Sequence, residues 1–162
     1  MSSGVNYSNR GNFDLIDNKI MIALLSIDQS RKPVKKLNLI LDTGAFITII
    51  NKKAAILNDY RVIEGESCHI RGFSEKGLLC DLRLVPTVIF CGYEIKDVII
   101  ATPKADGIIV SEVLGMNILE NFNFGFDLCK QEIYINKRND FISNKPRYQS
   151  GEVNVSNYFQ ST

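Results

Sequence analysis

The sequence predicts an all-β fold, a small closed or partly barrel-like sheet structure with one or two short helices. Two hairpin patterns carry this prediction. Apolar and polar residues alternate with period two through Ser67–Leu84, on both sides of the polar turn Ser74–Gly77, which indicates two antiparallel strands with one apolar face. The apolar segments Val88–Phe90 and Ile95–Ala101 flank the turn Cys91-Gly92 and predict a second hairpin.

Shorter patterns predict two further strands and a helix. Ile20–Ile27 is almost wholly apolar, and Leu37–Leu41 has Leu at every second position. Both are therefore expected to be buried strands, joined by the polar turn Asp28–Pro33. Asn51 has the side chain of a helix N-cap and is predicted to begin a short helix that extends through Leu57.

The second half of the chain contains one more helical pattern and one more hairpin. Val113-Leu114-Gly115 opens a short segment in which apolar residues recur at four-residue spacing. The alternating Phe residues of Phe122–Phe126, followed by Glu132–Asn136, predict a last hairpin. Pro86 is expected at a bend or an edge position between the two earlier hairpins, because proline cannot donate to a strand ladder.

Length and composition predict one globular domain. The 162 residues suffice for one domain with its own core and are short for two. We assign residues 1–18 to a polar N-terminal arm and residues 19–136 to the domain. Residues 137–162 are assigned to a polar C-terminal tail, either disordered or ordered only against a partner.

Charge and hydropathy argue against nucleic-acid and membrane partners. The net charge of +1 gives no reason to expect a polyanionic partner, and no stretch approaches the ~18 apolar residues that span a bilayer. The basic run Arg31–Lys36 is interpreted as a solvated turn rather than a nucleic-acid patch. The polar N-terminus lacks the apolar core of a signal peptide, so a cytoplasmic location is expected.

The cysteines and the single histidine predict neither a metal site nor a cofactor. The four cysteines form no Cys-x-x-Cys pair, and a zinc site is hard to assemble with one histidine. The cysteines are interpreted as reduced thiols, with a disulfide between Cys68 and Cys80 across the first hairpin as the alternative. Any Ser-His-Asp or Cys-His scheme would require His69, which alternation places on the solvent face of that hairpin.

The segment with the clearest chemistry is Leu39–Ala45. It places an acid, Asp42, at the end of a buried apolar strand, where a carboxylate is costly unless it is hydrogen-bonded or used. Thr43 and Gly44 make a tight turn there, so Asp42 is presented at a chain reversal. On physical grounds alone, Asp-Thr-Gly is also compatible with a turn that is merely capped by a carboxylate.

Three features in order resemble the retropepsins and their cellular and bacterial single-domain relatives. The first is Asp42–Ala45 with a Thr four places past the Gly. The second is Val113–Leu119, about seventy residues further on, which resembles the family's second signature of two apolar residues and a Gly that open a short helix. Between them, Ile70–Leu78 lies where the family has a glycine-containing flap hairpin. The resemblance covers roughly Ile20–Ile135.

The chain departs from many viral members of that family at two positions. Those members have an Asp after Asp-Thr-Gly-Ala and an Arg after the Gly of the second signature, and the two form an ion pair. This chain has Phe46 and Met116 instead. An ion pair can be replaced by an apolar contact without loss of stability, so Phe46 and Met116 are expected to pack against each other.

The resemblance implies an aspartic endopeptidase that hydrolyses a peptide or protein substrate. Asp42 is then the catalytic residue, and the single Asp-Thr-Gly implies a homodimer in which two copies of Asp42 share the site. Thr43, Gly44 and Ala45 are expected to support the active site. The family's flap role falls on Ile70, Gly72 and Phe73 in this sequence. The alternative is a non-catalytic dimerisation or peptide-binding module with the same fold.

Overall fold

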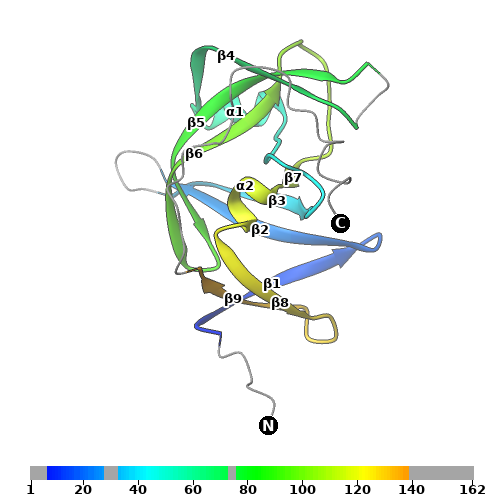
Figure 1. Cartoon of the computed structure of the whole chain (residues 1–162), viewed down its shortest axis with the longest axis vertical. Coiled ribbons are helices and arrows are strands. Elements are labelled where there is room, and N and C mark those ends of the chain that lie inside the picture. The colour runs from blue at the N-terminus through cyan, green and yellow to red at the C-terminus, as the bar shows by residue number, and fades with distance from the viewer. Residues whose placement is uncertain (1–6, 28–32, 73–75, 139–162) are drawn as a thin grey trace.

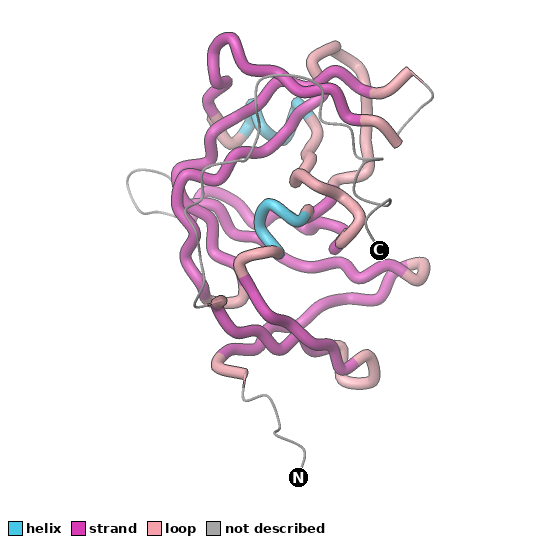
Figure 2. Tube along the Cα trace, viewed as in Figure 1, coloured by secondary structure: helices cyan, strands magenta, loops and turns pink. Residues whose placement is uncertain are grey.

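The computed structural model describes residues 7–27, 33–72 and 76–138. In these residues the chain is built mainly of strands, with two short helices (Figures 1 and 2). The elements, in order, are β1 (Asn9–Ile16), β2 (Lys19–Ile27), β3 (Pro33–Leu41), α1 (Lys52–Leu57), β4 (Arg61–Ile70), β5 (Leu78–Phe90), β6 (Tyr93–Pro103), β7 (Val113–Leu114), α2 (Met116–Leu119), β8 (Phe122–Asp127) and β9 (Glu132–Lys137).

The strands form one mixed sheet that curves around the core without closing. Its main path runs β4-β5-β2-β1-β9-β8, with β6 against β5 and with β3 between β2 and β7. Every pair is antiparallel except β3 with β7, which is parallel. The sheet is open between β4 and β8 in the described residues, so the predicted all-β fold with short helices is confirmed as an unclosed, curved sheet.

The long strand β5 joins the two predicted hairpins. It pairs with β6 along one edge from Cys80 to Phe90. Along its other edge it pairs first with β4 and then, from Thr87 to Ile89, with β2. Pro86 lies between those two partners, where its missing N–H costs no ladder bond. The turn between β5 and β6 has positive φ at both Cys91 (47°) and Gly92 (83°), as hairpin turns that match the strand twist require.

The sheet begins within the segment that the sequence analysis assigned to a polar arm. Residues Asn9–Asn12 of β1 pair with β9, and Phe13–Ile16 pair with β2. Phe13 is buried in the core, so one apolar residue in an otherwise polar strand anchors it. Residues 139–162 of the predicted C-terminal tail lie outside the described residues.

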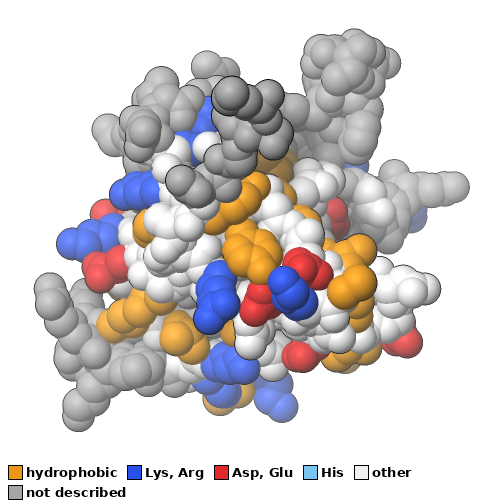
Figure 3. Space-filling model, turned by 90° about the horizontal axis from the view of Figure 1, so that it is seen from below, with side chains coloured by type: hydrophobic (Ala, Val, Ile, Leu, Met, Phe, Trp, Pro, Cys, Tyr) orange, Lys and Arg blue, Asp and Glu red, His pale blue; other side chains and the backbone are white. Residues whose placement is uncertain are grey.

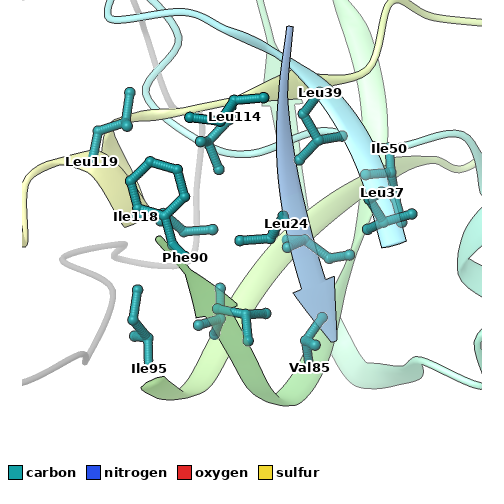
Figure 4. Packing of buried hydrophobic residues seen from close by; sticks show 14 of the residues in the cluster. Leu24, Leu37, Leu39, Ile50, Val85, Phe90, Ile95, Leu114, Ile118 and Leu119 are labelled. Atoms are coloured by element: carbon teal, nitrogen blue, oxygen red, sulfur yellow. The ribbon is translucent and has the colours of Figure 1, made fainter. Parts of the chain in front are cut away.

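The core consists of two clusters of apolar side chains. The larger one includes side chains from β2, β3, β5, β6 and α2 (Figure 4). Its fully buried members include Leu24, Leu39, Phe90, Leu114 and Ile118, and each such side chain contributes roughly 1.5–3 kcal/mol relative to exposure. The second cluster lies under the β4–β5 hairpin and consists of Ile47, Ile49, Cys68, Ile70, Leu78, Cys80, Leu82, Ala101 and Val113.

Both predicted helices are present and short. The second begins one turn later than the apolar spacing suggested, because Val113 and Leu114 form strand β7 beside β3 and the helix starts after Gly115. It then ends at Leu119, and Phe122 already belongs to β8. Backbone pairing with β3 therefore takes precedence over the four-residue spacing at this point.

The face seen from below in Figure 3 carries charge of both signs. Lys and Arg side chains lie there among Asp, Glu and hydrophobic side chains (Figure 3).

Neither helix in the described part of the chain has the length and apolar character needed to span a membrane.

Candidate active site

The end of strand β3 fixes the backbone of Asp42. Leu39 is fully buried, and β3 has neighbours on both sides, β2 and β7. The parallel pairing of β3 with β7 places Leu41 beside Leu114. Asp42 then continues the ladder, because its N–H donates to the Leu114 carbonyl at 3.1 Å. The carboxylate is thus attached to a backbone that is hydrogen-bonded to β7 at the point where β3 ends.

A tight turn orients the Asp42 side chain. The Gly44 N–H donates to Asp42 Oδ1 at 2.9 Å, and the Ala45 N–H donates to the Asp42 carbonyl at 3.2 Å. A Cβ at Gly44 would lie 3.2 Å from Asp42 Oδ1, so glycine lets the backbone approach the carboxylate. Asp42 and Ala45 are half-buried, whereas Thr43 and Gly44 are exposed.

One carboxylate oxygen of Asp42 is hydrogen-bonded to the backbone of its own turn. In the described part of the chain, the hydrogen bond to this carboxylate comes from Gly44 and reaches Oδ1. Within the described residues, no hydrogen bond reaches the other oxygen, Oδ2.

A buried polar network behind the turn ties it to the second signature. Thr48 Oγ1 donates to Asn117 Oδ1 at 2.9 Å and accepts from the Gly115 N–H at 3.0 Å. The Thr48 N–H also donates to Asn117 Oδ1, at 2.8 Å. Asn117 in turn donates from Nδ2 to the Ile99 carbonyl of β6 at 2.8 Å. The network joins the Asp42 loop, the start of α2 and β6 in one rigid unit.

Sequence reasoning did not identify Thr48 and Asn117 as site residues. The signal was available as the Thr four places past Gly44 and the Asn two places past Gly115. Their partnership joins residues that are 69 positions apart, so only the folded chain brings them together.

Gly115 allows the two signature segments to touch. A Cβ at this position would lie 2.5 Å from the Ile47 carbonyl carbon and 2.8 Å from the Thr48 nitrogen. These are backbone atoms, which cannot move aside as a flexible side chain does. With glycine, the Met116 N–H reaches the Ala45 carbonyl at 2.7 Å, and the Asn117 N–H reaches the Phe46 carbonyl at 3.1 Å.

The two apolar replacements, Phe46 and Met116, lie on segments that are bonded through their backbones. Phe46 packs against the second cluster and Met116 against the larger one. Contact between the two side chains stays a prediction.

The β4–β5 hairpin shares an apolar cluster with the Asp42 loop. Ile70 is 5% exposed and belongs to the second cluster, against which Ala45 packs. Ile70 and Ala45 of the Asp42 loop therefore belong to the same apolar cluster. Gly72 is exposed and has φ of +113°, a conformation that favours glycine. Phe73 lies outside the described residues.

Asn51 anchors the loop between β6 and β7 instead of capping α1. Its side chain makes no capping hydrogen bond, which corrects the capping role predicted from the sequence. Asn51 Nδ2 donates to the Val110 carbonyl at 3.1 Å, and Asn51 Oδ1 accepts from the Val110 N–H at 2.9 Å. Lys52 holds the start of the same loop through the Lys104 carbonyl and Asp106. The loop thereby presents Ile109, which is 87% exposed.

The chemistry available at Asp42 is that of a carboxyl group. Across residues 7–27, 33–72 and 76–138, no group of three or more His, Cys, Asp or Glu side chains is arranged to hold a metal ion. The sequence contains one Asp-Thr-Gly, so each chain contributes one such carboxyl.

The fold has a solved counterpart. The chain is similar to the crystal structure of a retropepsin-like aspartic protease from Rickettsia conorii, with a TM-score of 0.54 and 18% sequence identity over 81% of this chain and 95% of that one. This chain has a retropepsin-like fold. It is also similar to EIAV protease complexed with the inhibitor HBY-793, with a TM-score of 0.46 and 21% identity over 72% of this chain and 92% of that one. The sequence matches no protein-family model and no curated protein.

In this retropepsin-like fold, the two signature segments lie against each other. Asp42 stands at the open end of the β3–β7 pair, and Gly115 lets the second segment close behind it. The family resemblance drawn from the sequence is thus confirmed for the fold.

Proposed function

We propose that this protein is an aspartic endopeptidase that uses two copies of Asp42, one from each subunit of a homodimer. The observation that carries the proposal is the setting of Asp42. A half-buried carboxylate follows directly on β3, a strand that is paired on both sides, and one of its oxygens accepts from a backbone N–H. A second copy of this chain would supply the second carboxyl, because the sequence has one Asp-Thr-Gly.

Two carboxyl groups that face each other can divide the work of acid and base. Like charges at close range cannot both ionise cheaply, so one group keeps its proton while the other is ionised. The ionised carboxylate takes a proton from a water molecule, which attacks the carbonyl carbon of the scissile peptide. The protonated carboxyl donates to the carbonyl oxygen and later assists departure of the amine. The apparent pKa values then belong to the pair.

The neighbouring residues have supporting roles in this proposal. The exposed Thr43 side chain is free to meet the partner's loop, which would brace the two turns against each other. Gly44 holds Asp42 Oδ1 and presents backbone to a bound peptide, and Ala45 anchors the turn to the core. The segment of the chain that contains Ile70, Gly72 and Phe73 would act as a flap over the substrate.

Hydrolysis of a mixed peptide library by wild-type protein and by Asp42→Asn tests the proposal. The variant should lose activity, because an amide can neither accept the proton from water nor share one with the partner. Asp14→Asn is the matched control, since Asp14 is an exposed carboxylate on β1, and it should keep full activity. Hydrolysis retained by Asp42→Asn would exclude the mechanism.

Dilution tests the requirement for a dimer. Below the dissociation constant of the dimer, specific activity should fall with protein concentration, and sedimentation should show the change to monomer over the same range. If the wild type binds peptides but never cleaves them, the non-catalytic module with this fold is the correct description.

A further inference from the structure

Two cysteines face each other at the base of the β4–β5 hairpin tip. Cys68 of β4 is the direct ladder partner of Cys80 of β5. Directly opposed residues in an antiparallel pair have Cα atoms about 4.5–5.5 Å apart, and disulfides join Cα atoms about 4.4–6.8 Å apart. The backbone therefore already meets the main geometric requirement of a disulfide, whichever type of ladder pair the two residues form.

The two thiols are also in contact with each other. A side-chain hydrogen bond from the partner lowers the pKa of Cys68 despite its burial. The same hydrogen bond, followed by burial, raises the pKa of Cys80. Both side chains are in the second cluster, with Cys68 4% exposed and Cys80 fully buried, so they point to the same side of the hairpin and toward each other.

We propose that Cys68 and Cys80 form a disulfide site, and that peroxide oxidation joins β4 to β5 below the hairpin tip. The Cys68 thiolate attacks hydrogen peroxide, its sulfur becomes a sulfenic acid, and hydroxide leaves. The Cys80 sulfur then attacks the Cys68 sulfur, the S–O bond breaks, and water leaves with the proton of the Cys80 thiol. The two thiols lose two electrons in total, and the peroxide is reduced to two molecules of water.

The position of the pair in the sheet provides access for a small oxidant. β4 is at one end of the sheet path, and its pairing with β5 is interrupted between Val62 and Ser67. Strand ends next to turns open locally at a small fraction of the cost of global unfolding. A molecule the size of peroxide can therefore reach Cys68 while the rest of the core stays folded.

The other two cysteines have no such partner. Cys91 lies in the β5–β6 turn, where burial raises the pKa of its thiol to about 11. Cys129 is exposed in the turn between β8 and β9. Neither is opposed to another cysteine in the ladders of the described residues, so the intramolecular disulfide should be specific to Cys68 and Cys80.

Mapping of thiols after mild oxidation tests the proposal. The full-length chain carrying Cys91→Ser and Cys129→Ser is treated with hydrogen peroxide, unfolded and alkylated, and compared with the untreated protein. The expected result is loss of both alkylatable thiols together, a peptide that links Cys68 to Cys80, and recovery of both thiols with a reductant. Thiols that stay free, disulfide-linked dimers or a stable sulfenic or sulfinic acid on Cys68 would overturn the proposal.

Single replacements and a folding control complete the test. Cys80→Ser should leave the Cys68 sulfenic acid unresolved, so that a dimedone-type probe labels it, whereas the protein that keeps both cysteines should show at least tenfold less label. In urea above the unfolding midpoint, disulfide formation should slow, since folding holds the sulfurs together. If the disulfide formed as fast or faster in the unfolded chain, the fold would not be what brings the two sulfurs together, and the proposal would be overturned.

The proposed disulfide does not rest on the proposed function. Asp42→Asn should form the disulfide at the wild-type rate, so failure of the protease proposal leaves this inference standing. In either case, amide hydrogen exchange between Cys68 and Cys80 should slow on oxidation and return on reduction. Unchanged exchange in this segment would contradict a cross-link that holds the hairpin.

Discussion

Replacement of Thr48 by Val removes one hydroxyl and almost no volume. That hydroxyl is completely buried and makes two hydrogen bonds, one to Asn117 Oδ1 and one from the Gly115 N–H. Val keeps the shape of the side chain but can neither donate nor accept. The substitution therefore probes the polar network behind Asp42 with little change in packing.

The expected loss of stability follows from the hydrogen-bond partners that Thr48→Val leaves without the hydroxyl. The Gly115 N–H loses its acceptor in a buried place, which costs about 1–3 kcal/mol. The donated bond to Asn117 contributes about 1 kcal/mol more, although Asn117 Oδ1 still accepts from the Thr48 N–H at 2.8 Å. We therefore expect Thr48→Val to lower the free energy of unfolding by about 2–4 kcal/mol. Thr48→Ser keeps the hydroxyl and loses one buried methyl, at a cost of about 1 kcal/mol.

Urea unfolding followed by circular dichroism measures both variants. Thr48→Val should move the midpoint to lower urea with an unchanged slope, because the surface exposed on unfolding stays the same. Thr48→Ser should fall between Thr48→Val and the wild type. The reasoning is refuted if Thr48→Val lies within about 0.5 kcal/mol of the wild type, or if Ser destabilises as much as Val.

Two further predictions concern the same region and the loop beside it. Gly115→Ala should lower the free energy of unfolding by at least about 2 kcal/mol, because its Cβ would meet backbone atoms at 2.5–2.8 Å. Gly107→Ala, which faces open space at φ +77°, should cost about 1–2 kcal/mol from its backbone conformation alone; a larger loss there would refute the steric argument. The hydrogen bond from Lys52, then its charge, lowers the pKa of Asp106. The stabilisation from this pair is therefore complete above the usual carboxyl pKa of about 3.9 and is lost as pH falls through the lower folded value. An NMR titration of the Asp106 carboxyl should show this low pKa, and Lys52→Gln should return it to its usual range; an identical titration in both proteins would contradict the pairing.

Local patterns predicted those elements whose strands are neighbours in sequence. The period-two alternation through Ser67–Leu84 and the Cys91-Gly92 turn correspond to real hairpins. Their register depends on turn geometry and on which face is apolar, and both are visible in the sequence. The strand β1 was harder to predict, because Phe13 is its only buried side chain and no alternation distinguishes it from a polar arm.

Predictions that depended on one residue's local preference were less secure. Asn51 is a good N-cap by chemistry, yet its side chain binds Val110. An amide that can donate and accept at once satisfies both backbone groups of a distant residue, which a cap bond could not do. Tertiary partners of this kind leave no periodic signal in the sequence.

The sequence alone determined that this is an all-β chain with one Asp-Thr-Gly at the end of a strand, because side-chain alternation and turn chemistry act over a few residues. Only the tertiary structure decided which segments meet. It joined Thr48 to Asn117, closed Gly115 onto the backbone at Ile47, and set Cys68 directly opposite Cys80. A sequence pattern specifies the face on which a side chain lies, whereas its partner across the core depends on how the whole sheet curves.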